Sequence, residues 1–293
     1  MSRTFLVAGG DLRQVYLAEA LAKNNCVYAV GFDSHNPNFK RVKTLEGLSQ
    51  FHKHADYLIL PLPASDDGIT VSAPFGKSNL NTEVLTDMLA PSALVLGGKM
   101  HPNICKLFAD KGFETIDYFK REELNIYNAV PTAEGAIQLA MEELATTISG
   151  QRVLITGFGR IGRVLAATLH SLGAKVTAAA RKYSDLAWAE VSGCETVHMS
   201  ELCSVLSETD LIFNTVPSMI FDKEKLGQLS SDALIIDLAS KPGGVDFNAA
   251  GELGIRAIWA LSLPGKVAPI TSGKIIASTI TNILRERGIT DAD

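Results

Sequence analysis

The sequence has 293 residues, which suggests about two domains, and carries a net charge of −5 at pH 7. Hydrophobic residues make up 46% of it and charged residues 20%, so a large buried core is expected and disorder is not. The negative charge and the absence of basic runs argue against nucleic acid as a partner. No apolar run reaches the roughly 20 residues that a membrane-spanning helix needs, so no membrane partner is expected.

The cysteines and histidines indicate no metal site or disulfide framework. Cys26, Cys105, Cys194 and Cys203 are scattered and form no C-x-x-C pair, which favours reduced thiols in a cytosol. The six histidines have no metal-ligand spacing, so no metal is expected. The residues after Met1 lead into an apolar strand and do not resemble a signal peptide. We therefore expect a cytoplasmic location.

The first part of the chain alternates predicted strands with predicted helices. The strands are predicted at 4–8, 26–32, 56–62, 93–96 and 114–118, and the helices at 12–23, 82–89 and 103–111. Such alternation predicts a mainly parallel sheet. The loops at the carboxyl ends of its strands form the edge where ligands of such sheets bind.

The loop after the first strand, Gly9-Gly10-Asp11-Leu12-Arg13, has two interpretations. It lacks the glycine triplet of a phosphate-binding loop and carries charge where that loop needs bare backbone. It is therefore either a degenerate nucleotide fold whose loop faces a substrate, or an ordinary turn in which Asp11 caps the next helix.

The middle of the chain is predicted to link two domains. A short helix is predicted at 122–127, and Pro131 suits the first turn of a longer helix over 131–148 that acts as a hinge. Further strands are predicted at 153–156, 175–180, 196–198, 210–216, 234–238 and 257–261. We expect domains at 1–130 and 131–270, with the C-terminal helix, within 271–293, packing back on the first domain by fold analogy.

A glycine-rich stretch gives the strongest functional signal. The apolar strand Val153–Thr156 runs into Gly157-Phe158-Gly159-Arg160-Ile161-Gly162 and then a helix. Gly157 permits a tight turn, Gly159 lets the backbone approach a pyrophosphate, and Gly162 lets the helix pack closely on the strand. The helix N-terminus faces the phosphates. The alternative is a plain glycine-rich turn. We predict an α/β protein with two Rossmann-like domains and mainly parallel sheets, joined by an interdomain helix.

The next predicted strand indicates which dinucleotide binds. An NAD site usually places Asp or Glu after this strand, whereas this chain has Arg181-Lys182-Tyr183-Ser184. A guanidinium can bind a 2′-phosphate with two hydrogen bonds, so we favour NADP over NAD; the alternative is a solvated basic turn. The predicted cofactor-binding residues are Gly157, Phe158, Gly159, Arg160, Ile161, Gly162, Arg181, Lys182, Ser184, Thr215, Val216, Pro217 and Ser240.

Several stretches together resemble one family. They are residues 7–14, 127–135, 157–162, 214–219, 237–244 and 263–269, which span nearly the whole chain. On these stretches the sequence resembles the A-subunit family of the dipicolinate synthases of endospore-forming bacteria. The resemblance implies NADP-dependent oxidation of dihydrodipicolinate or hydroxytetrahydrodipicolinate to dipicolinate. It also implies expression in the cytoplasm of the sporulating mother cell and a flavoprotein-like B subunit.

A wider resemblance is to the 2-hydroxyacid dehydrogenases, which have two domains of this kind. Their catalytic histidine, paired with a carboxylate late in the nucleotide domain, has no clear equivalent here. The stretch after Leu261 contains Lys266 and no histidine. Hydroxyacid oxidation is therefore disfavoured, and no catalytic base follows from this resemblance.

The candidate substrate and catalytic residues follow from the chemistry of a dicarboxylate. Two carboxylates need cations or backbone N–H groups, and Arg13, Lys99 and Lys266 each follow a predicted strand. If the two sheet edges face each other, Arg13 and Lys99 meet the carboxylates opposite the nicotinamide. His101 is either the base or a polar loop residue. Asp237 is either catalytic or a buried hydrogen-bond anchor, and we favour the anchor.

Two other functions stay open from the sequence. One is another NADP-dependent two-domain dehydrogenase that acts on a different small acid. The other is a nucleotide-sensing protein without catalysis, whose chemistry resides on a partner. In each case we expect a homo-oligomer.

Overall fold

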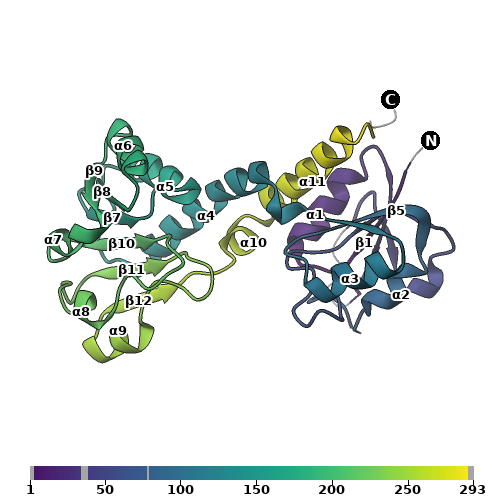
Figure 1. The fold of residues 1–293 in the computed structure, drawn as a ribbon, viewed down its shortest axis with the longest axis horizontal. Coiled ribbons are helices and arrows are strands. Elements are labelled where there is room, and N and C mark those ends of the chain that lie inside the picture. Colours follow the sequence, from purple (N-terminus) through teal and green to yellow (C-terminus); the bar gives the residue numbers. More distant parts are fainter. Residues whose placement is uncertain (1–2, 34–38, 78, 290–293) are drawn as a thin grey trace. The chain divides into compact units, whose positions relative to one another are not determined.

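The computed structural model describes residues 3–33, 39–77 and 79–289. The chain divides into two compact units, the first formed by residues 1–128 with 268–293 and the second by residues 129–267 (Figure 1). Each unit contains one six-stranded sheet, and the paired strands in both sheets are parallel. The predicted class of two Rossmann-like α/β domains is confirmed.

The first unit has the strand order β3-β2-β1-β4-β5-β6, which is the doubly wound order of dinucleotide-binding sheets. Its strands are β1 (Thr4–Ala8), β2 (Cys26–Val30), β3 (Lys43–Leu45), β4 (Ala55–Ile59), β5 (Leu89–Gly97) and β6 (Glu114–Asp117). Strand β3 was not predicted. It has three residues at the sheet edge, two of them exposed, and therefore leaves no apolar run in the sequence.

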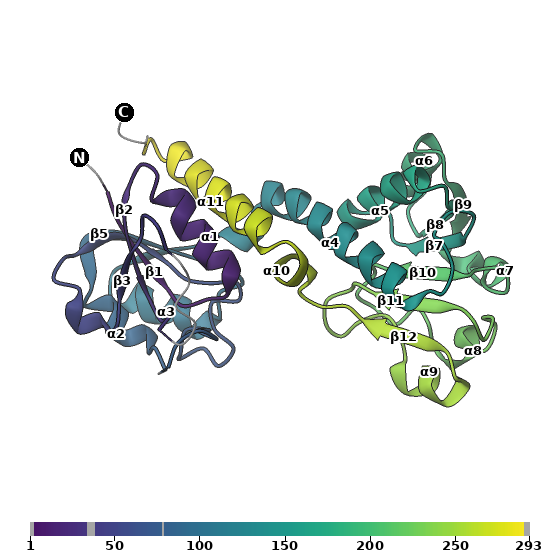
Figure 2. The same cartoon turned by 180° about the vertical axis from the view of Figure 1, so that it is seen from behind.

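Helices cover both faces of the first sheet. They are α1 (Leu12–Leu21), α2 (Thr82–Thr86), α3 (Pro102–Asp110) and α11 (Pro269–Glu286), with 3-10 turns η1 (Leu48–Gln50) and η2 (Tyr118–Lys120). Helix α11 lies beside α1 in both views (Figures 1 and 2). Gly273 makes this approach possible, because a Cβ there would lie 2.8 Å from the Tyr16 side chain. The chain thus returns to the first unit after completing the second.

The second unit has the order β12-β11-β10-β7-β8-β9. Taken in the opposite direction, from β9 to β12, this is the same doubly wound order as in the first unit. Its strands are β7 (Arg152–Thr156), β8 (Lys175–Ala180), β9 (Glu195–His198), β10 (Leu211–Asn214), β11 (Leu234–Asp237) and β12 (Arg256–Trp259). Its helices are α5 (Arg160–Ser171), α6 (Tyr183–Val191), α7 (Cys203–Leu206), α8 (Lys223–Leu226), α9 (Phe247–Leu253) and α10 (Leu263–Val267), with the 3-10 turn η3 (Met199–Glu201).

Alternating strand residues fill the two cores of the second unit. Ile155 and Phe213 belong to the core that includes Leu165 of α5, whereas Leu154 and Ile212 belong to the core that includes Leu226 of α8. A strand buried on both faces needs such a continuous apolar sequence. The sheet of the second unit is therefore packed on both faces.

Helix α4 (Glu122–Glu143) corrects the predicted hinge region. The predicted break before Pro131 is wrong, because Pro131 lies inside one continuous helix that ends at Glu143 and not at residue 148. An internal proline costs about 3 kcal/mol. Packing offsets this cost, since Leu124 is buried in a core of the first unit, and Ala133 and Ala136 in a core of the second.

Candidate functional site

The glycine loop after β7 combines two tightly packed glycines with one open glycine. Gly157 has φ +88°, and a Cβ there would collide with the Thr215 side chain. A Cβ on Gly162 would collide with the Gly157 carbonyl oxygen. In contrast, a Cβ on Gly159 would meet no described atom within 4 Å, and Gly159 is the exposed N-cap of α5. The protein therefore leaves open the side of the loop where a pyrophosphate fits.

A buried polar network joins the ends of three neighbouring strands. Thr156, Asn214 and Asp237 are the last residues of β7, β10 and β11 and lie in register. The Thr156 hydroxyl donates to Asn214 Oδ1 (2.6 Å), and Asn214 Nδ2 donates to Asp237 Oδ1 (2.7 Å). All three side chains are fully buried. The network ties together the loops at the carboxyl edge of the sheet.

The contacts of Asp237 support the anchor interpretation and not a catalytic one. Besides Asn214, its carboxylate accepts the backbone N–H groups of Ala239 (3.0 Å) and Gly244 (2.8 Å). These bonds close the loop 237–244 on itself. With no exposed surface and three N–H donors, Asp237 positions backbone and does not face a ligand.

The loops after β10 and β11 hold the remaining predicted cofactor residues. The Thr215 hydroxyl donates to the Thr156 carbonyl (2.9 Å), and the Val216 N–H donates to Asn214 Oδ1 (3.1 Å). Pro217 and Ser240 are exposed beyond them. The structure therefore brings these residues to the same sheet edge as the glycine loop. Phe158 is buried below that loop, and Arg160 and Ile161 begin α5.

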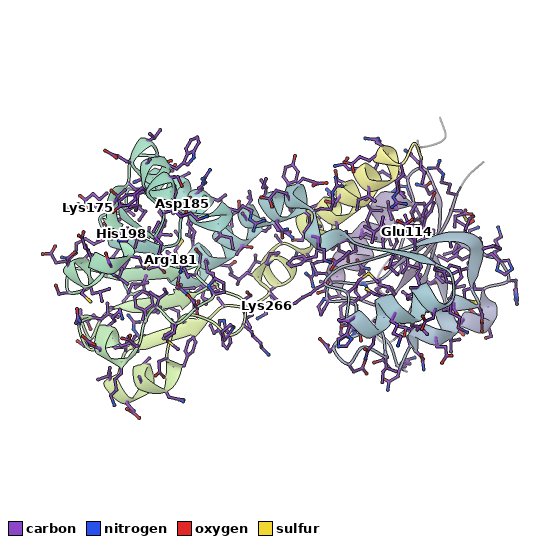
Figure 3. The ribbon with its side chains drawn as sticks, in the orientation of Figure 1. Glu114, Lys175, Arg181, Asp185, His198 and Lys266 are labelled. Atoms are coloured by element: carbon purple, nitrogen blue, oxygen red, sulfur yellow. The ribbon has the colours of Figure 1, made fainter. Side chains whose placement is uncertain are left out.

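The end of β8 presents two cations to solvent. Arg181 and Lys182 follow the strand, and Ser184 lies in the first turn of α6. All three are exposed, and in the described part of the chain the Arg181 and Lys182 side chains have no hydrogen-bond or ion-pair partner. Figure 3 shows Arg181 close to His198, the last residue of β9. The position and the unpaired charge fit a 2′-phosphate.

The loop after β1 contains a paired arginine and not a free one. Asp11 caps α1, accepting the Arg13 N–H (2.9 Å), as the ordinary-turn interpretation proposed. The guanidinium of Arg13 also donates to Asp11 Oδ2 (2.8 Å) and to the Leu62 carbonyl (2.6 Å). Its side chain is only 14% exposed. Arg13 therefore clamps the β1 loop to the loop after β4, with part of its charge balanced by Asp11.

Lys99 and His101 lie at the end of β5. Lys99 is exposed in the left-handed region (φ 51°), and Asp117 holds the turn by accepting its N–H (2.9 Å). His101 caps α3, because its Nδ1 accepts the Asn103 N–H (3.2 Å), and its ring lies against Gly68. Since Nδ1 is an acceptor here, the neutral ring holds its proton on Nε2. This geometry supports a capping role for His101 over that of a base.

The remaining candidate lysine lies in the second unit, and a buried tyrosine lies in the first. Lys266 is exposed on α10 (Figure 3). Tyr118, fully buried near Arg13, donates to the Leu60 carbonyl (3.0 Å), and burial raises the pKa of its hydroxyl. Among the described residues, no group of three or more His, Cys, Asp or Glu side chains could hold a metal, and no helix is long and apolar enough to cross a membrane.

Sequence reasoning missed the contacts of His198 and Tyr183. His198 Nε2 lies 3.1 Å from the Arg181 carbonyl oxygen, and the Tyr183 and His198 rings stack with centroids 5.3 Å apart. The only sequence signal for these contacts was the place of His198 at the end of a predicted strand. His198 ends the strand next to β8, and parallel neighbouring strands bring their carboxyl ends to one edge.

Comparison with known proteins identifies similar chains along nearly the whole length. A family model for the N-terminal domain of the dipicolinate synthase A subunit matches residues 4–119, and one described as D-isomer specific 2-hydroxyacid dehydrogenase, NAD binding domain, matches residues 125–245. The second unit therefore contains a nucleotide-binding dehydrogenase domain.

Full-length relatives agree with both matches. The chain is 34% identical over 286 residues to the dipicolinate synthase A subunit of Bacillus subtilis (strain 168), covering 96% of this chain and 95% of that protein. The crystal structure of the corresponding subunit from Bacillus halodurans has a TM-score of 0.88 and 30% identity, covering 96% of this chain and 97% of that one. The crystal structure of its counterpart from Bacillus subtilis has a TM-score of 0.87 and 32% identity, covering 98% and 97%.

Proposed function

Because the chain belongs to the A-subunit family of dipicolinate synthases, we propose that it oxidises dihydrodipicolinate or hydroxytetrahydrodipicolinate to dipicolinate, with NADP as the hydride acceptor. The observation that carries the proposal is the match along nearly the whole chain, together with the open glycine loop in the dehydrogenase domain. Dihydrodipicolinate loses one hydride and one proton in this reaction. The hydroxylated substrate also loses water.

The second unit supplies groups that suit each part of the cofactor. The N–H groups at the start of α5, beside the open Gly159, would bind the pyrophosphate. Arg181, Lys182 and Ser184 would bind the 2′-phosphate through charge-assisted hydrogen bonds. When bound, the nicotinamide ring takes up the hydride.

The buried network keeps the cofactor loops in position. Asn214 and Asp237 fix the starts of the loops that present Thr215, Val216, Pro217 and Ser240. These loops would contact the ribose and the nicotinamide. Their backbone is already held by buried and partly buried hydrogen bonds, so binding does not have to order it.

Lys99 is the best-placed cation of the first unit for a substrate carboxylate. Its side chain is exposed, and within the described residues its ammonium group has no ion-pair partner. Arg13 is the weaker candidate, since Asp11 and the Leu62 carbonyl already occupy two of its nitrogen atoms. Lys266 is the third proposed cation. No proton is assigned to His101 or Asp237, because both have structural hydrogen bonds.

The family also supports proposals about context. We infer that the chain assembles into a homo-oligomer, acts in the cytoplasm of a sporulating mother cell, and has as its partner a flavoprotein-like B subunit. The relatives are named as one subunit of a larger synthase, which supports a partner chain.

The test is turnover of freshly generated dihydrodipicolinate by the purified full chain, with and without the B subunit. We expect NADPH to appear in equal amount with dipicolinate, which chromatography identifies. Turnover of a different small acid, with none of dihydrodipicolinate, would assign another substrate. Cofactor binding without turnover in either preparation would favour a sensing role.

A further inference from the structure

We propose that His198 is a positioning residue for cofactor choice, which holds the Arg181–Lys182 backbone so that both cations face the 2′-phosphate of NADP. The inference rests on the proposed NADP function and adds a residue on a different strand to it. His198 ends β9, whereas the two cations follow β8 (Figure 3).

The hydrogen bonds of the ring define one tautomer. His198 Nε2 lies 3.1 Å from the Arg181 carbonyl oxygen, and a carbonyl oxygen can only accept, so Nε2 carries the proton. Nδ1 then accepts from the Ser200 hydroxyl (2.7 Å) and from the Ser200 N–H (3.3 Å). Both ring nitrogens are thereby satisfied in the neutral form, with the donor directed at Arg181.

The ring also holds the residue on the far side of Lys182. Tyr183 stacks on His198 at an interplanar angle of 19°, although the residue is 77% exposed. One imidazole thus contacts both residue 181, through the carbonyl, and residue 183, through the ring face. Lys182 lies between these two contacts and is fixed by both.

The connection that holds the two cations has no side-chain helix cap. Strand β8 ends at Ala180 and α6 begins at Tyr183, so the cations lie on a two-residue connection. Lys182 is the N-cap of α6 but makes no side-chain capping bond, which Ser, Thr, Asp or Asn normally supplies. The Arg181 and Lys182 side chains are exposed, so a restraint on the connection must come from its backbone. The Lys182 carbonyl accepts the N–H groups of Asp185 (3.0 Å) and Leu186 (3.1 Å), and His198 adds the restraint at Arg181.

Loss of the His198 contact should affect the affinity for NADP and not the affinity for NAD. NAD has no 2′-phosphate, and its pyrophosphate contacts lie at the glycine loop after β7. Removing the Nε2 donor should therefore weaken NADP binding and leave NAD binding unchanged. One net hydrogen bond corresponds to about a fivefold change in affinity.

The experiment measures the dissociation constants of NADP and NAD by calorimetry for the full chain and three variants. His198→Asn keeps a polar group near the Nδ1 position and removes the Nε2 donor. His198→Gln places an amide donor near the Nε2 position. His170→Asn, on α5, makes the same chemical change away from the connection. Thermal unfolding of each variant confirms that it is folded.

We expect His198→Asn to raise the dissociation constant of NADP about fivefold with NAD within about twofold, and His198→Gln to restore most of the loss. His170→Asn should change neither value. If the wild-type chain prefers NADP and His198→Asn keeps that preference, this inference alone is overturned. The same holds if His198→Asn weakens the binding of both cofactors equally. A wild-type chain with no preference for NADP overturns the proposed cofactor and the inference together.

Discussion

The two units share one strand order but differ in the loop that follows the first strand of each sheet. After β1, the chain itself fills the space beside the glycines: a Cβ on Gly9 would lie 2.8 Å from Val71 and 2.9 Å from the Ser72 carbonyl oxygen, which also accepts the Gly10 N–H (2.8 Å). After β7, the corresponding first glycine, Gly157, is just as enclosed, because a Cβ there would collide with the Thr215 hydroxyl oxygen. The difference lies at the helix N-cap, which is Asp11 for α1 but Gly159 for α5, where a Cβ would meet no described atom within 4 Å.

The units also differ after the second strand of each sheet, where the charged side chain is bonded in the first unit and, among the described residues, unpartnered in the second. Asp33 follows β2, and its carboxylate accepts the Lys77 N–H at 3.3 Å. Arg181 follows β8 with an exposed side chain that has no partner among the described residues. The doubly wound sheet therefore provides a dinucleotide edge only where the chain leaves the loop open and the charges unpaired. On this ground we propose that the second unit binds the cofactor and that the first unit binds the substrate.

The largest effect should come from closing the open loop. We expect Gly159→Val to lower NADP affinity at least a hundredfold, about 2.7 kcal/mol, because the side chain occupies the pyrophosphate space. Stability should hardly change, since that space contains no described protein atom. Calorimetric titration with NADP and thermal unfolding measure the two quantities. Gly251→Val, in another open space on α9, is the control. Unchanged affinity in a folded variant would remove the pyrophosphate site from this loop.

The converse change in the first unit should affect stability and not binding. Gly9 has φ +63° and close neighbours, so Gly9→Ala should lower the free energy of unfolding by about 2 kcal/mol. NADP affinity should stay within about twofold. Urea unfolding measures the change in stability, and calorimetric titration with NADP measures the affinity. A stable variant that has lost NADP would contradict the division of roles between the units.

A smaller change should follow from removing the cation after β8. We expect Arg181→Ala to lower the ratio of NADP to NAD affinity about tenfold, or roughly 1.5 kcal/mol, through the loss of a charge-assisted hydrogen bond. Lys175→Ala, at the opposite end of the same strand, is the matched control (Figure 3). The ratio comes from calorimetry with each cofactor. If both variants give the wild-type ratio, Arg181 does not contact the phosphate.

The smallest effect concerns the turn at Asp67. This turn precedes Val71 and Ser72, which lie against the loop after β1. Asp67 accepts the N–H groups of Ile69 and Thr70 (both 2.8 Å), and these bonds hold the pKa of its carboxyl well below the usual range. A lowered folded pKa gives stability that is complete above about pH 4 and is lost as the pH falls further. Asp67→Asn should flatten this part of the stability profile between about pH 4 and 2. Identical acid profiles for the variant and the wild type would exclude the contribution.

Much of the fold was predictable because its signals are local. Strand β1 is apolar after Thr4, and β8 ends in three buried alanines. The predicted bounds of both strands are those of the structure. Short edge strand β3 has no such signal. Pro131 was misleading because local propensity gives way to packing against residues that are distant in sequence.

The site was less predictable because its pairings are not local. The glycine spacing was informative, since each glycine has a steric role in the loop itself. The clamp of Arg13 on the Leu62 carbonyl joins residues 49 positions apart, and no pattern in the sequence contains it. The contact of His198 with Arg181 depends likewise on the pairing of β8 with β9.

The central claim, that the second unit alone binds the dinucleotide, is tested most directly by the stoichiometry of NADP binding. Calorimetric titration of the full chain should give one NADP per chain. Gly159→Val should abolish this binding, and Gly9→Ala should retain it at one per chain. Two molecules per chain, or one that persists in folded Gly159→Val and disappears in Gly9→Ala, would contradict the claim.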